Sequence, residues 1–184
     1  MENEASTRDR LRFLRRLRAV RRFLARPVPP QAVDDILEVA RWSGSANNRQ
    51  PWELVVVRDA ATLQALGTLP GAIYARHLAG APLGIVLVMS GEPGREVHET
   101  YDEGRLSERI MLAAAAHGLG SCIGWFPGES AAAAKRLLGI PQERLVRTAI
   151  SIGYPDAQAQ QSRSRADQPR KPLSELVHQE RYGG

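Results

Sequence analysis

Two arginines, Arg18 and Arg21, stand three positions apart shortly before a proline-rich turn that begins at Pro27. The planar guanidinium group of arginine suits bidentate contact with phosphate, so two arginines on one helix face can clamp a phosphate dianion. Nine arginines occur between Arg8 and Arg26, however, and such a density also fits a solvated helix face. The segment therefore indicates either a phosphate site or an ordinary charged surface.

A second segment that could do chemistry holds the side-chain amides of Asn47, Asn48 and Gln50. Each amide carries hydrogen-bond donors and an acceptor, which matches a planar ring whose edge carries both kinds of atom. The alternative is an asparagine-rich turn in which Trp52 anchors a buried strand. The residues alone favour this second interpretation.

A third segment places Gly118, Gly120 and Gly124 within seven residues. Glycine allows a backbone to lie close to a flat or bulky group, and N–H groups in such a backbone can donate to an atom on which negative charge develops. Cys122 lies inside the segment, but no histidine or aspartate pattern beside it indicates a nucleophile. A small buried apolar side chain is the better interpretation of Cys122.

The composition disfavours several other kinds of site. Cys122 is the only cysteine among 184 residues and the four histidines are scattered, so no metal centre is expected. The glycine fingerprints of Rossmann and P-loop nucleotide sites are missing. No apolar run approaches the roughly 20 residues that a membrane helix needs, and the N-terminus lacks a signal-peptide pattern, so a cytoplasmic protein is expected.

Apolar patterns predict the elements that must position these three segments. Uninterrupted apolar runs predict strands at 53–58, 83–89 and 146–154, with a short strand or extended loop at 121–126. Helical spacing predicts helices at 11–20, from about 31 to a polar loop at 43–48, in part of 60–80, at 96–117 and at 130–138. We expect one domain over 1–184, with residues 1–10 flexible and residues 156–184 forming an extended C-terminal arm that a partner subunit covers.

Taken together, the segments resemble the nitroreductase family of FMN-dependent oxidoreductases. The resemblance is carried by the arginine segment before the prolines, by Asn48-Arg49-Gln50-Pro51-Trp52 and by Gly118-Leu119-Gly120-Ser121-Cys122-Ile123-Gly124. Further matches lie at 36–42, 137–141, 152–155 and 170–177. These matches follow one another in the family's order from roughly Arg15 to the C-terminus.

The resemblance implies an α+β, three-layer nitroreductase-like fold, in which helices flank a central, mostly antiparallel sheet and the C-terminal arm is domain-swapped. It also implies a homodimer with FMN at the interface and NADH or NADPH as the electron donor. The implied FMN contacts are Leu17, Arg18, Ala19 and Arg21 at the phosphate and pyrimidine side; Ser45, Asn47, Asn48 and Gln50 from the other subunit; Cys122, Ile123, Gly124 and Trp125 along the isoalloxazine, with a backbone N–H for N5; and Arg170 with Lys171 at the phosphate.

The activity implied by the resemblance is the reduction of nitroaromatics, quinones or other flat acceptors by NAD(P)H in a ping-pong cycle. The cofactor carries the redox chemistry, so no catalytic acid–base residue is expected in the protein. Tyr74, His77, Tyr101 and Phe126 are candidates for the mouth of the pocket and equally for ordinary packing. The alternative function is a basic module that binds nucleic acid or an anionic membrane through the arginine-rich helix, which leaves the glycine segment unexplained.

Three residues depart from the family pattern. A basic residue and a serine commonly stand where this chain has Leu17 and Ala19, and a lysine often stands at the position of Gln168. These departures remove phosphate-binding charge and a hydroxyl donor. We therefore expect the affinity for FMN to be weaker than is usual in the family.

Overall fold

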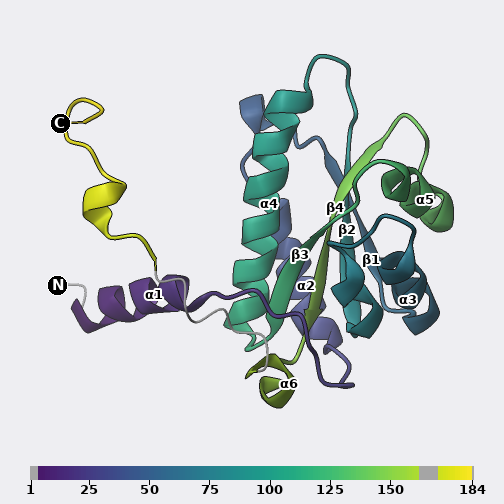
Figure 1. Ribbon diagram of the computed structural model, residues 1–184, viewed down its shortest axis with the longest axis horizontal. Coiled ribbons are helices and arrows are strands. Elements are labelled where there is room, and N and C mark those ends of the chain that lie inside the picture. The colour runs from purple at the N-terminus through teal and green to yellow at the C-terminus, as the bar shows by residue number, and fades with distance from the viewer. Residues whose placement is uncertain (1–3, 162–169, 184) are drawn as a thin grey trace.

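A four-stranded sheet forms the centre of the molecule in the computed structural model, which describes residues 4–161 and 170–183 (Figure 1). The strands lie in the order β1-β2-β4-β3, and each neighbouring pair is antiparallel. Their bounds are Trp52–Val57 for β1, Leu83–Met89 for β2, Gly120–Trp125 for β3 and Leu145–Gly153 for β4. The strands predicted from the apolar runs are confirmed to within one residue at each end.

Both faces of the sheet are covered, which explains why its apolar runs do not alternate with polar residues. Leu54 and Val56 of β1 contact one hydrophobic cluster, whereas Val55 and Val57 contact another. Strand β2 is buried along its whole length, because it lies between β1 and β4 and has helices on both of its faces. The sheet is therefore the middle layer of three.

Helices form the two outer layers. On one face, α2 (Pro30–Arg41) and α4 (Glu96–Ala116) pack Ile36 and Ile110 against the sheet. On the other face lie α3 (Ala60–Thr68), the 3₁₀ helix η2 (Arg76–Gly80) and α5 (Glu129–Leu138). The remaining short helices are η1 (Ala46–Asn48), α6 (Ala157–Gln161) and η3 (Leu173–Glu175). The predicted three-layer α+β arrangement is confirmed.

The N-terminal helix, α1 (Glu4–Arg16), ends earlier than its apolar spacing predicts. The prediction of a helix as far as Val20 is wrong, because Ala19 forms a β-bridge with Ser121 and the Val20 N–H donates to the Ser121 carbonyl oxygen at 2.8 Å. Pairing with the edge of β3 requires extended backbone, so a tertiary contact overrides the helical pattern. Residues 4–10, which the sequence predicts to be flexible, are helical, and their mobility stays a prediction.

Two segments lie outside the three layers. Helix α1 projects away from the sheet. The C-terminal arm, residues 170–183, lies away from the sheet on the same side as α1 (Figure 1). Leu11 and Leu14 on α1 and Leu173 and Leu176 on the arm are all at least half exposed. The exposed arm fits the predicted one, although α6 makes its first residues helical, and its packing on a partner stays a prediction. In the described part of the chain, no helix is both long enough and apolar enough to span a membrane.

Candidate functional site

A cleft of about 1020 Å³ lies where the end of α1 approaches the edge of β3, and we call it the arginine cleft. Pockets for small molecules commonly have volumes of about 300–1,000 Å³, so this one has room for a large ligand. Its wall comes from α1 and the segment after it, from α4 and β3, and from the start of the C-terminal arm. The lining residues are Arg12, Leu14, Arg15, Arg16, Leu17, Arg18, Ala19, Arg21, Glu108, Met111, Cys122, Ile123 and Arg170.

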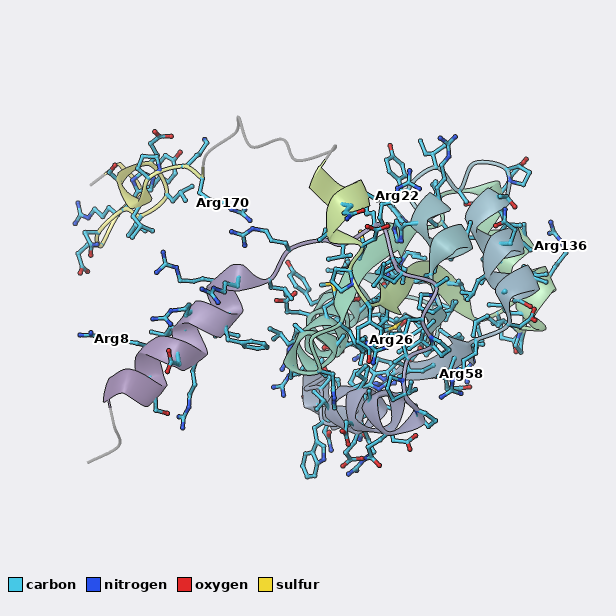
Figure 2. The ribbon with its side chains drawn as sticks, turned by 90° about the horizontal axis from the view of Figure 1, so that it is seen from below. Arg8, Arg22, Arg26, Arg58, Arg136 and Arg170 are labelled. Carbon is cyan, nitrogen blue, oxygen red and sulfur yellow. The ribbon has the colours of Figure 1, made fainter. Side chains whose placement is uncertain are left out.

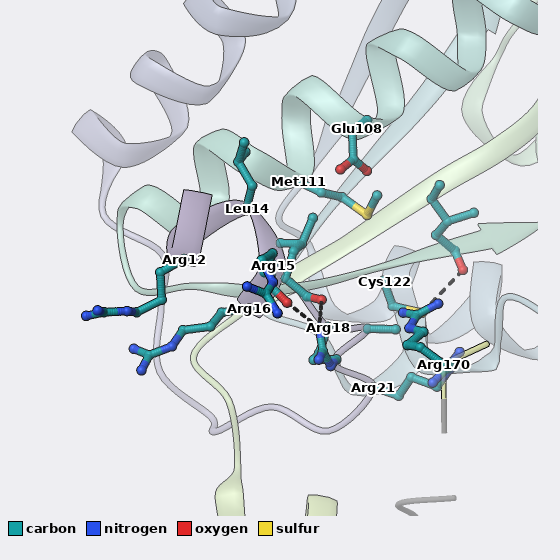
Figure 3. Close-up of a pocket in the computed structure, with 13 residues that line it drawn as sticks. Arg12, Leu14, Arg15, Arg16, Arg18, Arg21, Glu108, Met111, Cys122 and Arg170 are labelled. Atoms are coloured by element: carbon teal, nitrogen blue, oxygen red, sulfur yellow. Dashed lines mark hydrogen bonds between the residues drawn. The ribbon is translucent and has the colours of Figure 1, made fainter. Parts of the chain in front are cut away.

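Six of these lining residues are arginines, and they spread along the whole cleft. Arg21 and Arg170 lie beside Cys122, whereas Arg12 and Arg16 lie at the opposite end (Figure 3). In a second view, Arg170 marks the start of the C-terminal arm (Figure 2). The cleft therefore has a β3 end and an α1 end, each with its own guanidinium groups.

Most of this positive charge is not paired with a carboxylate in the part of the chain that the structure describes. Glu108 is the one carboxylate among the described residues that line the cleft. Arg15, Arg16, Arg21 and Arg170 form no ion pair with any described residue. Guanidinium groups that are exposed and unpaired are well suited to bind an anion.

Strand β3 borders the cleft, and its pairing with β4 decides which backbone groups face outward. The Phe126 N–H donates to the Arg147 carbonyl oxygen in β4 at 2.8 Å. Hydrogen-bonded positions alternate along an antiparallel pair, so Cys122 and Gly124 also direct their N–H groups toward β4. These two N–H groups are used inside the sheet, so a backbone N–H offered to a ring would come from the other residues of the predicted segment.

The residues of β3 that alternate with Cys122 and Gly124 direct their backbone groups to the outer edge of the strand, away from β4. The Ser121 carbonyl oxygen accepts from the Val20 N–H on that edge. Ile123 and Trp125 lie two and four residues further along the strand, so their backbone N–H and C=O groups point to the same edge. Their side chains are 44% and 53% exposed. The predicted backbone contact with a ring is thereby narrowed to the N–H groups of Ile123 and Trp125.

His77, on η2, contacts this same edge of β3. Its Nε2 lies 3.2 Å from the Ile123 carbonyl oxygen and its Nδ1 lies 2.7 Å from the Ser151 Oγ. A carbonyl oxygen can only accept, so Nε2 carries the proton in its contact with Ile123. Burial lowers the pKa of His77 below its usual value; the bond to Ile123 opposes this effect, and the positive charge of Arg21 reinforces it. His77 is therefore neutral near pH 7.

Of the four side chains suggested for the pocket mouth, His77 has the clearest link to the site. Phe126 is a core residue at 1% exposure, whereas Tyr101 is 73% exposed on α4. The ring of Tyr74 lies 6.3 Å from that of Trp125, measured between centroids. No local sequence signal singles out His77, because its partners come from β3 and β4.

The glycines of the third segment make room for the protein itself. A Cβ at Gly124 would lie 3.0 Å from the Cα of Ala75 and 3.2 Å from the Cε1 of His77. A Cβ at Gly120 would lie 2.6 Å from the Cβ of Val20. At Gly120 and Gly124 the bulky group that approaches the backbone is therefore the protein itself, namely the segment after α1 and η2.

Cys122 is a buried apolar residue, as expected. Its thiol donates weakly to the Ile123 carbonyl oxygen at 3.3 Å, and burial raises its pKa, while the positive charge of Arg21 acts in the opposite direction. A thiol with a raised pKa is a poor nucleophile near neutral pH. Over the described ranges, no group of three or more histidine, cysteine, aspartate or glutamate residues is placed to hold a metal ion.

The amide loop after α2 does not reach the arginine cleft of its own chain. Ser45 Oγ accepts from the Gln50 N–H at 2.8 Å, and Gln50 Nε2 donates to the Asn48 carbonyl oxygen at 3.1 Å. Asn47, Asn48 and Gln50 all have φ between 50° and 54°, a left-handed conformation that costs a residue such as glutamine about 1 kcal/mol or more. Such strain in an exposed loop is typical of functional segments.

The structure thus gathers half of the predicted FMN contacts in one cleft. Those that line it are Leu17, Arg18, Ala19, Arg21, Cys122, Ile123 and Arg170. Gly124 and Trp125 continue along β3, and Lys171 follows Arg170 as an exposed residue. Ser45, Asn47, Asn48 and Gln50 lie apart, as expected if a second subunit supplies them, and Gln168 lies outside the described residues.

Comparison with known proteins places the chain in a family. The nitroreductase family model matches residues 14–77 and 70–154, which include all four strands and most of the cleft. The chain belongs to the nitroreductase family. A candidate NADH dehydrogenase/NAD(P)H nitroreductase of Archaeoglobus fulgidus is 31% identical over 149 residues, which cover 79% of this chain and 84% of that relative.

Two further relatives of this nitroreductase-family oxidoreductase agree with the assignment. The NADH dehydrogenase of Thermus thermophilus is 29% identical over 175 residues, covering 75% of this chain and 82% of the relative. The solved structure of an FMN-dependent nitroreductase from Clostridium difficile R20291 is 26% identical, with a TM-score of 0.77 over 92% of this chain and 98% of that one. The predicted nitroreductase-like fold is confirmed, and exchange of the C-terminal arm stays a prediction.

Proposed function

We propose that this enzyme binds FMN in the arginine cleft and uses NADH or NADPH to reduce a flat acceptor, such as a nitroaromatic or a quinone. The observation that carries the proposal is the meeting of two sets of donors in one cleft. Unpaired guanidinium groups lie near the exposed backbone edge of Ile123. A ligand with a phosphate at one end and a planar ring at the other would engage both sets.

The β3 end of the cleft fits a phosphate. A phosphomonoester carries about −1.5 to −2 charges at pH 7, which two guanidinium groups can balance through charge-assisted hydrogen bonds. Arg21 and Arg170 lie together there and have no ion pair within the described ranges. Arg18 is the third candidate, although its Nη1 now donates to the carbonyl oxygens of Arg15 and Leu17, at 2.8 Å each.

The residues beside β3 fit a planar ring. Met111 and Cys122 supply apolar surface, and the outward N–H of Ile123 can donate to an atom that gains electron density. His77 holds the carbonyl oxygen of the same residue, so Ile123 is oriented before any ligand arrives. When bound, FMN supplies a ring that takes up a hydride from NAD(P)H and passes electrons to the acceptor. The protein's part is to bind, orient and stabilise charge.

We further propose that a second copy of the chain completes the site as a homodimer. The strained amide loop containing Asn47 and Gln50 does not line its own cleft and would be available to that of a second copy. Exposed leucines on α1 and on the C-terminal arm leave apolar surface that a second copy would cover. Light scattering is expected to give the mass of a dimer, and a monomer that retains stoichiometric flavin would contradict this part of the proposal.

The absorbance spectrum of the purified protein tests the cofactor assignment. Bands near ~450 nm are expected for an oxidised flavin, and anaerobic addition of NAD(P)H is expected to bleach them. A colourless protein that takes up no FMN would contradict the cofactor. A yellow protein that NAD(P)H does not bleach would contradict the electron donor.

Steady-state kinetics test the order of events. In the proposed ping-pong cycle, the oxidised nucleotide leaves the cleft before the acceptor enters it. Double-reciprocal plots at several fixed acceptor concentrations are therefore expected to be parallel. Intersecting lines would show that both substrates are bound together.

The lower affinity for FMN also stays a prediction. Leu17 and Ala19 line the cleft, where neither offers a charge or a hydroxyl. The substitutions Leu17→Arg and Ala19→Ser are expected to tighten FMN binding, measured by the flavin fluorescence released on dilution. Flavin that survives extensive dialysis of the unmodified protein would show that the remaining arginines compensate.

A further inference from the structure

The arginine cleft holds more positive charge than one phosphate requires. Arg21 and Arg170 suffice for a phosphomonoester at the β3 end, as argued above. Three more arginines line the same cleft: Arg12 and Arg16 lie at its α1 end, and Arg15 lies between them and Arg18 (Figure 3). The proposed phosphate contact leaves these three guanidinium groups without an assigned ligand.

These three residues share one face of α1. Positions three and four apart are neighbours on a helix, so Arg12 lies beside both Arg15 and Arg16. Like charges at this spacing destabilise a helix slightly, and an anion bound between them would reduce the repulsion. Arg12 pairs with Asp9 at 3.2 Å, but that pair is largely exposed, and Arg15 and Arg16 have no ion pair with a described residue.

The α1 end is also separated from the proposed FMN phosphate. In the close-up, Arg18 lies between the two groups of arginines, with Arg12 and Arg16 on one side and Arg21 and Arg170 on the other (Figure 3). A second anionic group could therefore bind at the α1 end while the β3 end is filled. The two nicotinamide nucleotides differ by one such group, a phosphomonoester on the adenosine ribose, for which arginine is the usual partner.

We propose that Arg12, Arg15 and Arg16 bind the ribose phosphate of NADPH, so that the enzyme uses NADPH in preference to NADH. This inference rests on the proposed function. It assigns the surplus arginines to the electron donor and leaves Arg18, Arg21 and Arg170 to the cofactor. The part of the affinity that comes from these charges is also expected to fall as ionic strength rises.

The test is rapid-mixing reduction of the FMN-loaded protein by each nucleotide, which gives a Kd for each. The unmodified protein is expected to bind NADPH at least tenfold more tightly than NADH. The double substitution Arg15→Gln with Arg16→Gln is expected to raise the Kd of NADPH by about tenfold or more and to leave that of NADH within about twofold. Arg10→Gln is the matched control, because Arg10 is an exposed residue of α1 that does not line the cleft.

Calorimetry gives a second readout that does not depend on turnover. Adenosine 2′,5′-bisphosphate is expected to bind the FMN-loaded protein more tightly than adenosine 5′-monophosphate, and the double substitution is expected to remove the difference. Retained flavin with equal or tighter binding of NADH overturns the inference alone. A preference for NADPH that survives the double substitution overturns the assignment to α1. A protein that takes up no FMN overturns the proposed function and the inference together.

Discussion

The sheet with its two helical layers differs from the arms, α1 and the C-terminal arm, in how much of its apolar surface is buried. Every residue of β2 is buried, and side chains from both helical layers contact the sheet. On α1 and the C-terminal arm, by contrast, Leu14 is 50% exposed and Leu173 is 74% exposed. Both faces of the sheet are covered within one chain, whereas the leucines of the arms lie open to solvent.

This difference locates the function at the boundary between the two regions. The body contributes a rigid edge at Ile123, held by His77, while the segment after α1 contributes the charge of Arg21 and the C-terminal arm that of Arg170. A site built in this way can keep its backbone donors in place while the arms adjust to a ligand or to a second subunit. The following substitutions measure how far the two regions are independent.

The largest effect is expected from a cavity in the body. Leu87→Ala on β2 removes a side chain that is fully buried, and it should lower the free energy of unfolding by about 2–5 kcal/mol. Leu173→Ala on the C-terminal arm should change it by no more than about 0.5 kcal/mol in dilute protein. Urea unfolding followed by circular dichroism at low and high protein concentrations measures both. A concentration-independent loss for Leu173→Ala as large as that for Leu87→Ala would contradict the distinction between body and arm.

The same division explains which parts of the fold the sequence could predict. The strands are predictable because local apolar runs end at turn residues, as where Pro82 precedes β2 and Pro155 follows β4. The end of α1 is not, because the chain becomes extended only where Ala19 pairs with Ser121, far away in the sequence. Periodicity carries no information about such a partner.

The site was predictable to a different extent. The resemblance to the family identified Arg18, Arg21 and Arg170, which the structure brings to one cleft. It named His77 only as one of four candidates for the pocket mouth, because the contacts of His77 exist only once η2 packs against β3. Pairing with β4 likewise decides which N–H groups of β3 point outward. The sequence alone therefore could not show that the outward N–H belongs to Ile123 and not to Gly124.

A second effect is expected where the N-terminal segment contributes charge to the cleft. Arg21→Gln should weaken FMN binding by roughly tenfold or more, because a hydrogen bond to a charged group contributes about 1.5–3 kcal/mol. Arg22→Gln is the matched control, because Arg22 is the next residue in the sequence and its exposed side chain does not line the cleft. Fluorescence titration of the apoprotein with FMN measures both affinities. Equal losses in the two variants would indicate a general effect of charge and not a defined contact.

A third effect is expected at the joint between the two regions. Gly120→Ala would place a methyl group against Val20 at 2.6 Å and push the segment after α1 off the edge of β3, at a cost of about 1–3 kcal/mol. Gly104→Ala is the matched control: it lies within α4, where an added Cβ has nothing within 4 Å, and it should stabilise the helix by up to about 1 kcal/mol. Thermal unfolding compares the two variants. A loss at Gly104 would show that another surface approaches α4 closely.

The smallest effect expected is on the pH dependence of stability, through His77. Burial lowers its pKa below the ordinary value of about 6.5, so between these two pKa values the unfolded chain binds more protons than the folded one. Stability should therefore be complete above about pH 6.5 and fall with decreasing pH, by at most about 1.4 kcal/mol per pH unit from this group. His77→Gln can still donate to the Ile123 carbonyl oxygen but does not titrate, so urea midpoints measured across this range should lose that part of the slope. Identical slopes in the two proteins would mean that His77 is protonated equally in the folded and unfolded states, and that the edge of β3 is not held by a neutral ring.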